Sequence, residues 1–246
     1  MSLTAANPVF DVIRGIVDEI ERTQTIALQR AAQITADSLT RDGILHVFGT
    51  GHSHMMAEEA FLRAGGLAQV NAILDPGLML HLSAIGSTQV ERLENYTPIV
   101  LKRYDLQPGD VMLIVSNSGR NVGPIDAALY AKERDLKVIA LTSAHSYKDL
   151  KVRHPLGKHL SQLADVVIDT CVPEGDASIN YPGVNERICP ISTIIGATLI
   201  EAFIYETVRE IVARGQQPRI LVSANIDADQ DLDTVFHGFR TRIRHL

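Results

Sequence analysis

The sequence predicts an α/β protein with a doubly wound, mostly parallel sheet of about five strands and an N-terminal helical arm. Two observations predict this class. Short apolar runs alternate with helical segments at the spacing of βα units. The strand runs are continuously apolar rather than alternating, which indicates a sheet that is buried on both faces and therefore parallel. The length of 246 residues, 46% of them hydrophobic, suits one α/β domain with extra helices.

The helical arm is predicted over residues 8–41, where apolar residues recur at i, i+3, i+4 spacing. Pro8 suits a first helical turn, and Asp42-Gly43 is a stop signal. The weaker stretch 21–25 allows a kink or a turn between two helices. We therefore expect residues 1–42 to be an arm that closes over the domain formed by residues 43–246, or over a partner subunit.

Beyond the arm, the period of the apolar pattern shortens. Strands are predicted at residues 44–48, 68–74, 111–115, 137–141 and 166–169, with a last short strand at 219–222. Helices are predicted at residues 54–64, 89–104, 122–134 and 192–213. The segment 143–160 is rich in Lys, Arg and His, and we expect a surface loop and a short helix there.

Composition and charge exclude several classes of protein. The net charge is −6, whereas a general nucleic-acid or membrane-surface binder needs a basic face. Two cysteines, Cys171 and Cys189, do not make a disulfide framework. The N-terminus lacks the pattern of a signal peptide, and the apolar runs are far shorter than the ~20 residues that span a bilayer. We expect a cytoplasmic protein that binds neither nucleic acid nor membrane.

Two small polar segments follow predicted strands and open helices. They are Gly49-Thr50-Gly51-His52-Ser53-His54 after the first strand and Ser116-Asn117-Ser118-Gly119-Arg120-Asn121 after the third. Ligands of an open parallel sheet bind beyond the carboxyl ends of its strands, where helix N-termini offer unpaired N–H groups. Both segments therefore favour a phosphate or a similar anion. The alternative is ordinary helix capping, because Ser and Asn are common N-caps.

Nucleotide-binding classes fit the same segments less well. The first segment lacks the third glycine of a dinucleotide-binding loop, because His54 stands there. Asp75 ends the second strand, where a dinucleotide fold has its ribose-binding acid, but Asp75-Pro76-Gly77 is also a turn signal. The sequence contains no GxxxxGK[ST], which excludes a P-loop nucleoside triphosphatase, and no GxSxG, which weakens an α/β-hydrolase reading.

The segments GTGHS and SNSGRN resemble the two phosphosugar-binding loops of the sugar isomerase (SIS) superfamily, whose sheet is flavodoxin-like. The stretch HVFGTGHSHMMAEEAFLRAGGL is similar to the phosphosugar isomerase branch near phosphoheptose isomerase, and the resemblance covers roughly residues 8–215. It implies a phosphorylated sugar as ligand and no cofactor or metal. The binding residues that it implies are Gly49, Gly51, Ser53, Ser116, Asn117, Ser118, Gly119 and Asn121.

The last residue of the second segment departs from the usual SxSGxT pattern of that superfamily. Asn121 stands where Thr is common, and the bulky cation Arg120 precedes it. An Asn side chain still caps a helix or donates to phosphate. Arg120 either contacts a phosphate or a second anionic group, or points to solvent.

An aldose–ketose isomerase needs a base that moves a proton between C1 and C2 and a group that helps to open the sugar ring. The resemblance implies a catalytic glutamate near the helix after the first loop, which makes Glu59 the candidate beside Glu58. The structural alternative is an i,i+4 ion pair between Glu59 and Arg63. Glu174, after the fifth strand, is the second candidate, and its alternative is a polar turn.

The histidines and Cys171 each allow a functional and a structural interpretation. His52 and His54 are candidates for ligand contact or ring opening, with helix capping as the alternative. A metal site formed by these two residues and His81 is a further hypothesis, but no familiar ligand spacing supports it. The alternative for His81 is a histidine packed among apolar residues. Cys171 reads as a small core residue rather than a nucleophile, because no cation stands beside it in the sequence.

The sequence leaves the reaction open. The first hypothesis is a phosphosugar isomerase, with a phosphosugar lyase or etherase as a related alternative. The second is a phosphosugar-sensing module without turnover, although the arm is too short and too acidic for a DNA-binding domain. The apolar surface of segments 8–41 and 192–213 predicts a homodimer or homotetramer, in which His237 or His81 reaches a neighbour's site.

Overall fold

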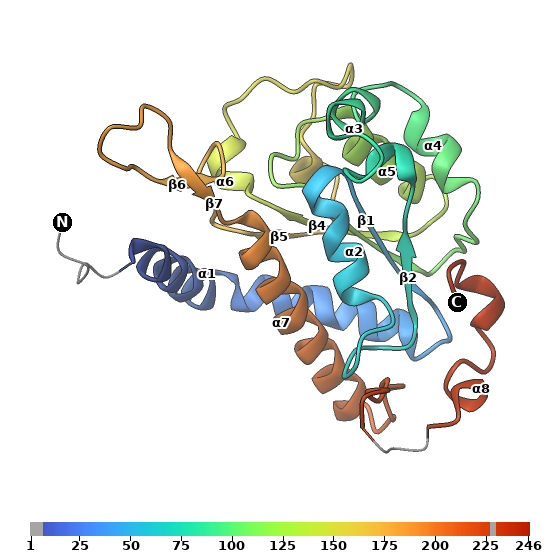
Figure 1. Cartoon of the computed structure of the whole chain (residues 1–246). Coiled ribbons are helices and arrows are strands. Elements are labelled where there is room, and N and C mark those ends of the chain that lie inside the picture. The colour runs from blue at the N-terminus through green and yellow to red at the C-terminus, as the bar shows by residue number, and fades with distance from the viewer. Residues whose placement is uncertain (1–6, 227–229) are drawn as a thin grey trace.

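A computed structural model describes residues 7–226 and 230–246 of the chain. Its centre is a five-stranded parallel sheet in the order β2-β1-β3-β4-β5, with helices on both faces (Figure 1). The strands are β1 (Leu45–Gly49), β2 (Val70–Ile73), β3 (Val111–Val115), β4 (Lys137–Thr142) and β5 (Val166–Asp169). The predicted doubly wound α/β class is confirmed.

The chain forms eight α-helices within its described part, several of them only one or two turns long. They are α1 (Pro8–Leu39), α2 (Met55–Ala60), α3 (Ala84–Val90), α4 (Tyr96–Leu101), α5 (Val122–Lys132), α6 (Ala144–Tyr147), α7 (Ser192–Ala213) and α8 (Leu232–Val235). The 3₁₀ turns η1 (Gly51–His54), η2 (Pro76–Leu78), η3 (Leu160–Gln162) and η4 (Arg240–Arg242) connect or end them. Within the same residues, none of these helices is long and apolar enough to cross a bilayer.

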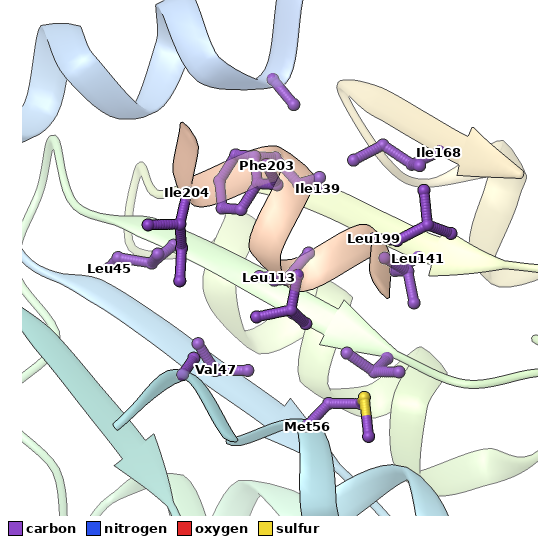
Figure 2. Close-up of a cluster of buried hydrophobic side chains, with 14 of the residues drawn as sticks. Leu45, Val47, Met56, Leu113, Ile139, Leu141, Ile168, Leu199, Phe203 and Ile204 are labelled. Carbon is purple, nitrogen blue, oxygen red and sulfur yellow. The ribbon is translucent and has the colours of Figure 1, made fainter. Parts of the chain in front are cut away.

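Two hydrophobic cores cover the faces of the sheet. On one face, Leu113 and Leu141 of the central strands pack with Phe203 of α7 and with residues of α1 and α2 (Figure 2). On the other face, Met112 and Ile114 pack with the buried sides of α4 and α5. Because successive side chains of a strand alternate between faces, each central strand contributes to both cores. This explains the continuously apolar strand sequences.

The predicted arm is one continuous helix. α1 runs through residues 21–25 without a break, so the arm is a single helix and the turn between two helices is absent. Its N-cap is Asn7, whose side chain accepts a hydrogen bond from the Val9 amide at 3.0 Å. The helix ends two residues earlier than predicted, and Asp42 then takes a left-handed conformation with φ 59°. α1 packs along α7, and together they cover one face of the sheet.

Three predicted elements differ from the structure. The helix predicted over 89–104 is two helices, α3 and α4, because Asn95 takes a left-handed conformation with φ 64° between them. The helix predicted over 54–64 ends at Ala60, because Phe61 is extended. The strand predicted over 219–222 is only an isolated antiparallel bridge between Ile220 and Leu67.

Two features of the fold were not predicted. One is an antiparallel pair of short strands, β6 (Ala177–Ile179) and β7 (Ile188–Pro190), which lies between β5 and α7 in the chain. The other is the C-terminal segment, where Phe239 packs with Ile44, the residue just before β1. Arg242 of this segment donates to the buried Asp110, 2.5 Å away. The tail therefore closes the end of the sheet that lies opposite the carboxyl ends of the strands (Figure 1).

Candidate functional site

The two predicted loops leave the sheet side by side. β1 and β3 are neighbours, and Gly49, the last residue of β1, is in register with Val115, the last residue of β3. Because the strands are parallel, both loops begin at the same level of the same edge. The carboxyl-end crevice expected from the sequence is therefore built mainly from these two segments.

The first loop turns so tightly that it needs glycine. A Cβ added to Gly49 would lie 2.3 Å from the Ser53 carbonyl oxygen, far inside van der Waals contact. Gly51 has φ +57°, a conformation that side chains rarely adopt. The turn closes when the Ser53 amide donates to the Thr50 carbonyl at 3.0 Å. This turn, η1, presents His52 and Ser53 at the end of the sheet.

The second loop is held by its own backbone and by the next strand. The buried Ser116 hydroxyl accepts from the Gly119 amide at 3.2 Å. The Asn117 carbonyl accepts from the Ser143 amide at 2.9 Å, which ties the loop to the end of β4. Asn121 is the N-cap residue of α5, but its side chain does not cap the helix. It takes part in the contact with Glu91 described below.

A small cavity lies between the loops and the start of α7. Its lining residues come from five segments of the chain: His52, Ser53, Met56, Val115, Asn117, Leu141, Thr170, Ser192 and Thr193. Three of the predicted site residues, His52, Ser53 and Asn117, meet here. Thr170, Ser192 and Thr193 were not predicted, although Thr170 follows β5 and the other two open α7. Their small polar side chains at element ends were the only signal.

The start of α7 is fixed by one carboxylate. Oδ1 of Asp176 accepts from the Ile191 amide at 3.0 Å and from the Ser192 amide at 2.7 Å. Its Oδ2 accepts from the Ser192 hydroxyl at 2.6 Å. A carboxylate at a helix N-terminus satisfies free amides and is favoured by the helix dipole. Asp176 thus holds Ser192 and Thr193 at the cavity.

A second carboxylate joins the two loops. Thr50 donates to Oε2 of Glu91 at 2.5 Å, and the Asn121 amide donates to Oε1 at 2.6 Å. The Glu91 backbone carbonyl accepts from the Gly123 amide, in the first turn of α5, at 2.8 Å. Burial raises the pKa of Glu91, although hydrogen bonds from Thr50 and Asn121 oppose the shift. Glu91 was missed because the sequence places it in a segment that reads as an ordinary surface helix.

The three carboxylates expected from the sequence lie outside the cavity lining. Glu59 pairs with Arg63, with 3.1 Å between Oε2 and Nη1, one helical turn after the cavity residue Met56. Glu58 is half exposed and lies 3.7 Å from Nε2 of His54. Glu174 is exposed in the turn after β5. The ion pair that was the structural alternative for Glu59 is therefore present.

Several other candidates have structural partners. His54 is buried, and its Nδ1 contacts the Gly51 carbonyl within the turn. Asp75 accepts hydrogen bonds from Tyr96, at 2.7 Å, and from Arg103. Its carboxylate is therefore occupied by these partners and not free to bind the ribose of a dinucleotide. Burial raises the pKa of the Cys171 thiol. In the described ranges, no three His, Cys, Asp or Glu residues are grouped as a metal site would require.

The fold and the paired loops define a class of protein. The sequence matches the SIS domain family over residues 10–143, and the chain belongs to that family. A structure of a phosphoheptose isomerase from Francisella tularensis has the same fold. It aligns with 85% of this chain and 99% of its own at a TM-score of 0.55 and 18% identity.

Within that class, the chain belongs to the UPF0309 family. It is 39% identical to the UPF0309 protein of Caldanaerobacter subterraneus subsp. tengcongensis, over 94% of this chain and 95% of the relative. It is 38% identical to the UPF0309 protein of Brucella canis, over 98% of this chain and 96% of the relative.

The close approach at Gly49 generates a stability prediction. Gly49→Ala is expected to lower the free energy of unfolding by about 1–3 kcal/mol, because the methyl group must displace the Ser53 carbonyl. Gly15→Ala is the matched control, since nothing lies within 4 Å of a Cβ at that exposed position in α1. It should stabilise the protein by up to about 1 kcal/mol. Urea denaturation of both variants measures the difference, and equal effects would contradict the geometry of the loop.

Proposed function

We propose that this protein binds a phosphorylated sugar in the cavity and interconverts its aldose and ketose forms. The observation that carries the proposal is the convergence of the two loops, in a chain of the SIS domain family, on one cavity lined with small polar groups. Hydroxyls, amides and backbone N–H groups are the donors that phosphate and sugar hydroxyls require.

In this proposal the two loops hold different parts of the ligand. Ser116, Ser118 and Gly119 bind the phosphate near the N-terminus of α5, where the helix dipole favours an anion. The Asn121 side chain is turned toward Glu91 rather than onto the first turn of that helix, which leaves the capping position to the ligand. Ser53 and Asn117 hold the hydroxyls of the sugar from the cavity wall.

The proposed reaction moves one proton along the sugar. A carboxylate takes the proton from C2 of the open-chain aldose and returns it to C1, while the proton of the C2 hydroxyl passes to the C1 oxygen. We assign this role to the carboxylate of Glu59, which follows the cavity residue Met56 by one helical turn. To act as the base, Glu59 must leave its ion pair with Arg63 and turn toward the substrate. His52, which lines the cavity, assists ring opening. Glu91 positions the loops through Thr50 and Asn121 without touching the substrate.

Binding is tested first at the second loop. The double substitution Ser116→Ala and Ser118→Ala removes two hydroxyl donors to a charged group, each worth about 1.5–3 kcal/mol. Phosphosugar affinity, measured by calorimetry over a panel of hexose and heptose phosphates, should fall at least about tenfold. Ser223→Ala, outside the lining of the cavity, is the control and should bind normally. Unchanged affinity in the double variant would remove the loop from the proposed site.

Ser116 also accepts the Gly119 amide, so loss of its hydroxyl disturbs the loop itself. Ser118→Ala alone separates the two effects, because the described residues provide no intramolecular hydrogen-bond partner for the Ser118 hydroxyl. A loss of affinity in Ser118→Ala with an unchanged melting temperature therefore reports on binding alone.

Chemistry is tested at Glu59. Glu59→Gln keeps the shape of the side chain and removes the base, so kcat should fall by about 10²–10⁴-fold with little change in phosphosugar affinity. Glu58→Gln is the control, since the neighbouring position points about 100° away around the helix. If Glu59 serves only its ion pair with Arg63, turnover stays unchanged and stability changes by less than about 1 kcal/mol.

Variants at Glu91 separate positioning from catalysis. Glu91→Gln replaces one of the two accepting oxygens by an NH2 group, so that either Thr50 or Asn121 loses its acceptor. This disturbs the loops without removing a group that contacts substrate. We expect KM to rise more than kcat falls. A loss of kcat at Glu91 as large as the loss expected at Glu59 would transfer the base to Glu91. If neither substitution lowers kcat, Glu174 becomes the candidate for the base. Phosphosugar binding without turnover across the panel would favour a sensing module.

We also propose that the protein assembles as a homodimer or homotetramer. Both long helices carry exposed apolar side chains: Ile26 of α1 is 80% exposed and Tyr205 of α7 is 66% exposed. Ile26→Glu with Tyr205→Glu should shift the mass measured by light scattering toward the monomer at micromolar concentration. Ile85→Glu, at an equally exposed position of α3, is the control. A monomeric wild-type protein would contradict this proposal and the contribution of His237 or His81 to a neighbour's site.

A further inference from the structure

A basic pocket lies beside the second loop, outside the cavity described above. The segment between α6 and η3 forms most of it, and its cationic or titratable lining residues are Arg120, Lys148, Lys151, Arg153, His154 and His159. The lining contains no acidic residue. This local excess of positive charge contrasts with the net charge of the whole chain, which is −6.

In the described part of the chain, most of the cationic side chains of the pocket lack an ion-pair partner. Within the described ranges, Arg120, Lys148, Lys151 and Arg153 have no ion pair with a carboxylate. His154 is the exception, because its Nε2 lies 3.0 Å from Asp126. Desolvation, together with the nearby charges of Arg120 and Arg92, lowers the pKa of Arg153, although the carboxylate of Glu91 opposes the shift. Neighbouring like charges repel each other, and an anion between them relieves the repulsion.

The pocket is joined to the second loop by hydrogen bonds. The Arg153 amide donates to the Arg120 carbonyl at 2.9 Å, and its guanidinium donates to Oδ1 of Asn121 at 2.9 Å. The Leu160 amide donates to the Gly119 carbonyl at 2.8 Å. These contacts hold the basic segment against the loop, so that the pocket and the cavity share the loop as a common wall.

The unpartnered side chain of Arg120, in the second loop, indicates that the pocket binds an anion. Nε of Arg120 is buried and makes no hydrogen bond. Leaving a charged donor buried without a partner costs free energy, and an anion in the pocket would recover it. A concave pocket with two guanidinium and two ammonium groups suits a compact phosphate group, which accepts from several donors at once.

We propose that this basic pocket is a second anion-binding site, which takes a phosphate group of a small molecule next to the proposed sugar site. The phosphate has two possible sources with the same chemistry. It belongs either to a sugar carrying two phosphates, one in each site, or to a separate phosphorylated effector. The pocket's own charges carry this proposal, so it stands even if the isomerase reaction fails.

Inorganic pyrophosphate is the probe for the site, with binding measured by calorimetry at low salt. Lys148→Gln with Lys151→Gln removes two exposed charges of the pocket and should weaken pyrophosphate binding by about tenfold. Lys102→Gln with Lys137→Gln makes the same change in net charge away from the pocket lining and should leave binding unchanged. Equal affinities in the two double variants would overturn the proposal.

Further arms separate the sources of the phosphate and the other classes of ligand. If the pocket binds a separate phosphorylated effector, pyrophosphate still binds to the variant that carries both Ser116→Ala and Ser118→Ala. If one ligand spans both sites, the two lysine substitutions weaken fructose 1,6-bisphosphate but not fructose 6-phosphate. Pyrophosphate binding that depends on the serines alone would overturn the second site. So would binding of a 20-base-pair DNA duplex that the lysine substitutions abolish while pyrophosphate binding is unaffected.

Discussion

The pairing of β1 with β3 is the constraint on which the rest of the site depends. Both strands lie in the interior of a parallel sheet, and their last residues, Gly49 and Val115, are in register. The two loops must therefore leave the sheet within one strand spacing of each other. That proximity allows Glu91 to reach Thr50 of one loop and Asn121 of the other. It also explains the glycine at position 49, because a side chain there would collide with the returning backbone.

Carboxylates that do not line the cavity nevertheless organise it. Asp176 fixes the start of α7, and Glu91 joins the loops, each by accepting several hydrogen bonds at once. Cavity-lining groups such as Ser53, Asn117 and Thr193 are neutral. A cavity of neutral donors held by carboxylates behind it accepts an anion without placing a negative charge beside it. Burial raises the pKa of Glu91, and its hydrogen bonds from Thr50 and Asn121 oppose that shift.

Charge is distributed unevenly around this edge of the sheet. The chain as a whole is acidic, yet the basic segment is bonded through Arg153 to the second loop. Cation-rich and neutral polar surfaces thus share one wall. Arg120, the cation of the second loop, lines the basic pocket beside that wall.

Much of the fold could be predicted from the sequence because it depends on local patterns. Continuous apolar runs identified the parallel sheet, α7 was predicted with its observed ends, and the polar segments after β1 and β3 were recognised by their glycines and hydroxyls. The break at Asn95 and the single bridge at Ile220 escaped prediction, because they depend on a left-handed residue and on distant contacts.

The site divides in the same way between sequence and tertiary structure. The sequence by itself determined that His52, Ser53 and Asn117 lie at the carboxyl edge, since each follows a strand directly. Only the tertiary structure decided that Thr170 and Thr193 complete the cavity and that Glu91 joins the loops. It also decided that Glu59 pairs with Arg63. The physical reason is that hydrogen bonds and ion pairs depend on distances between side chains, and chain folding sets those distances between segments far apart in the sequence.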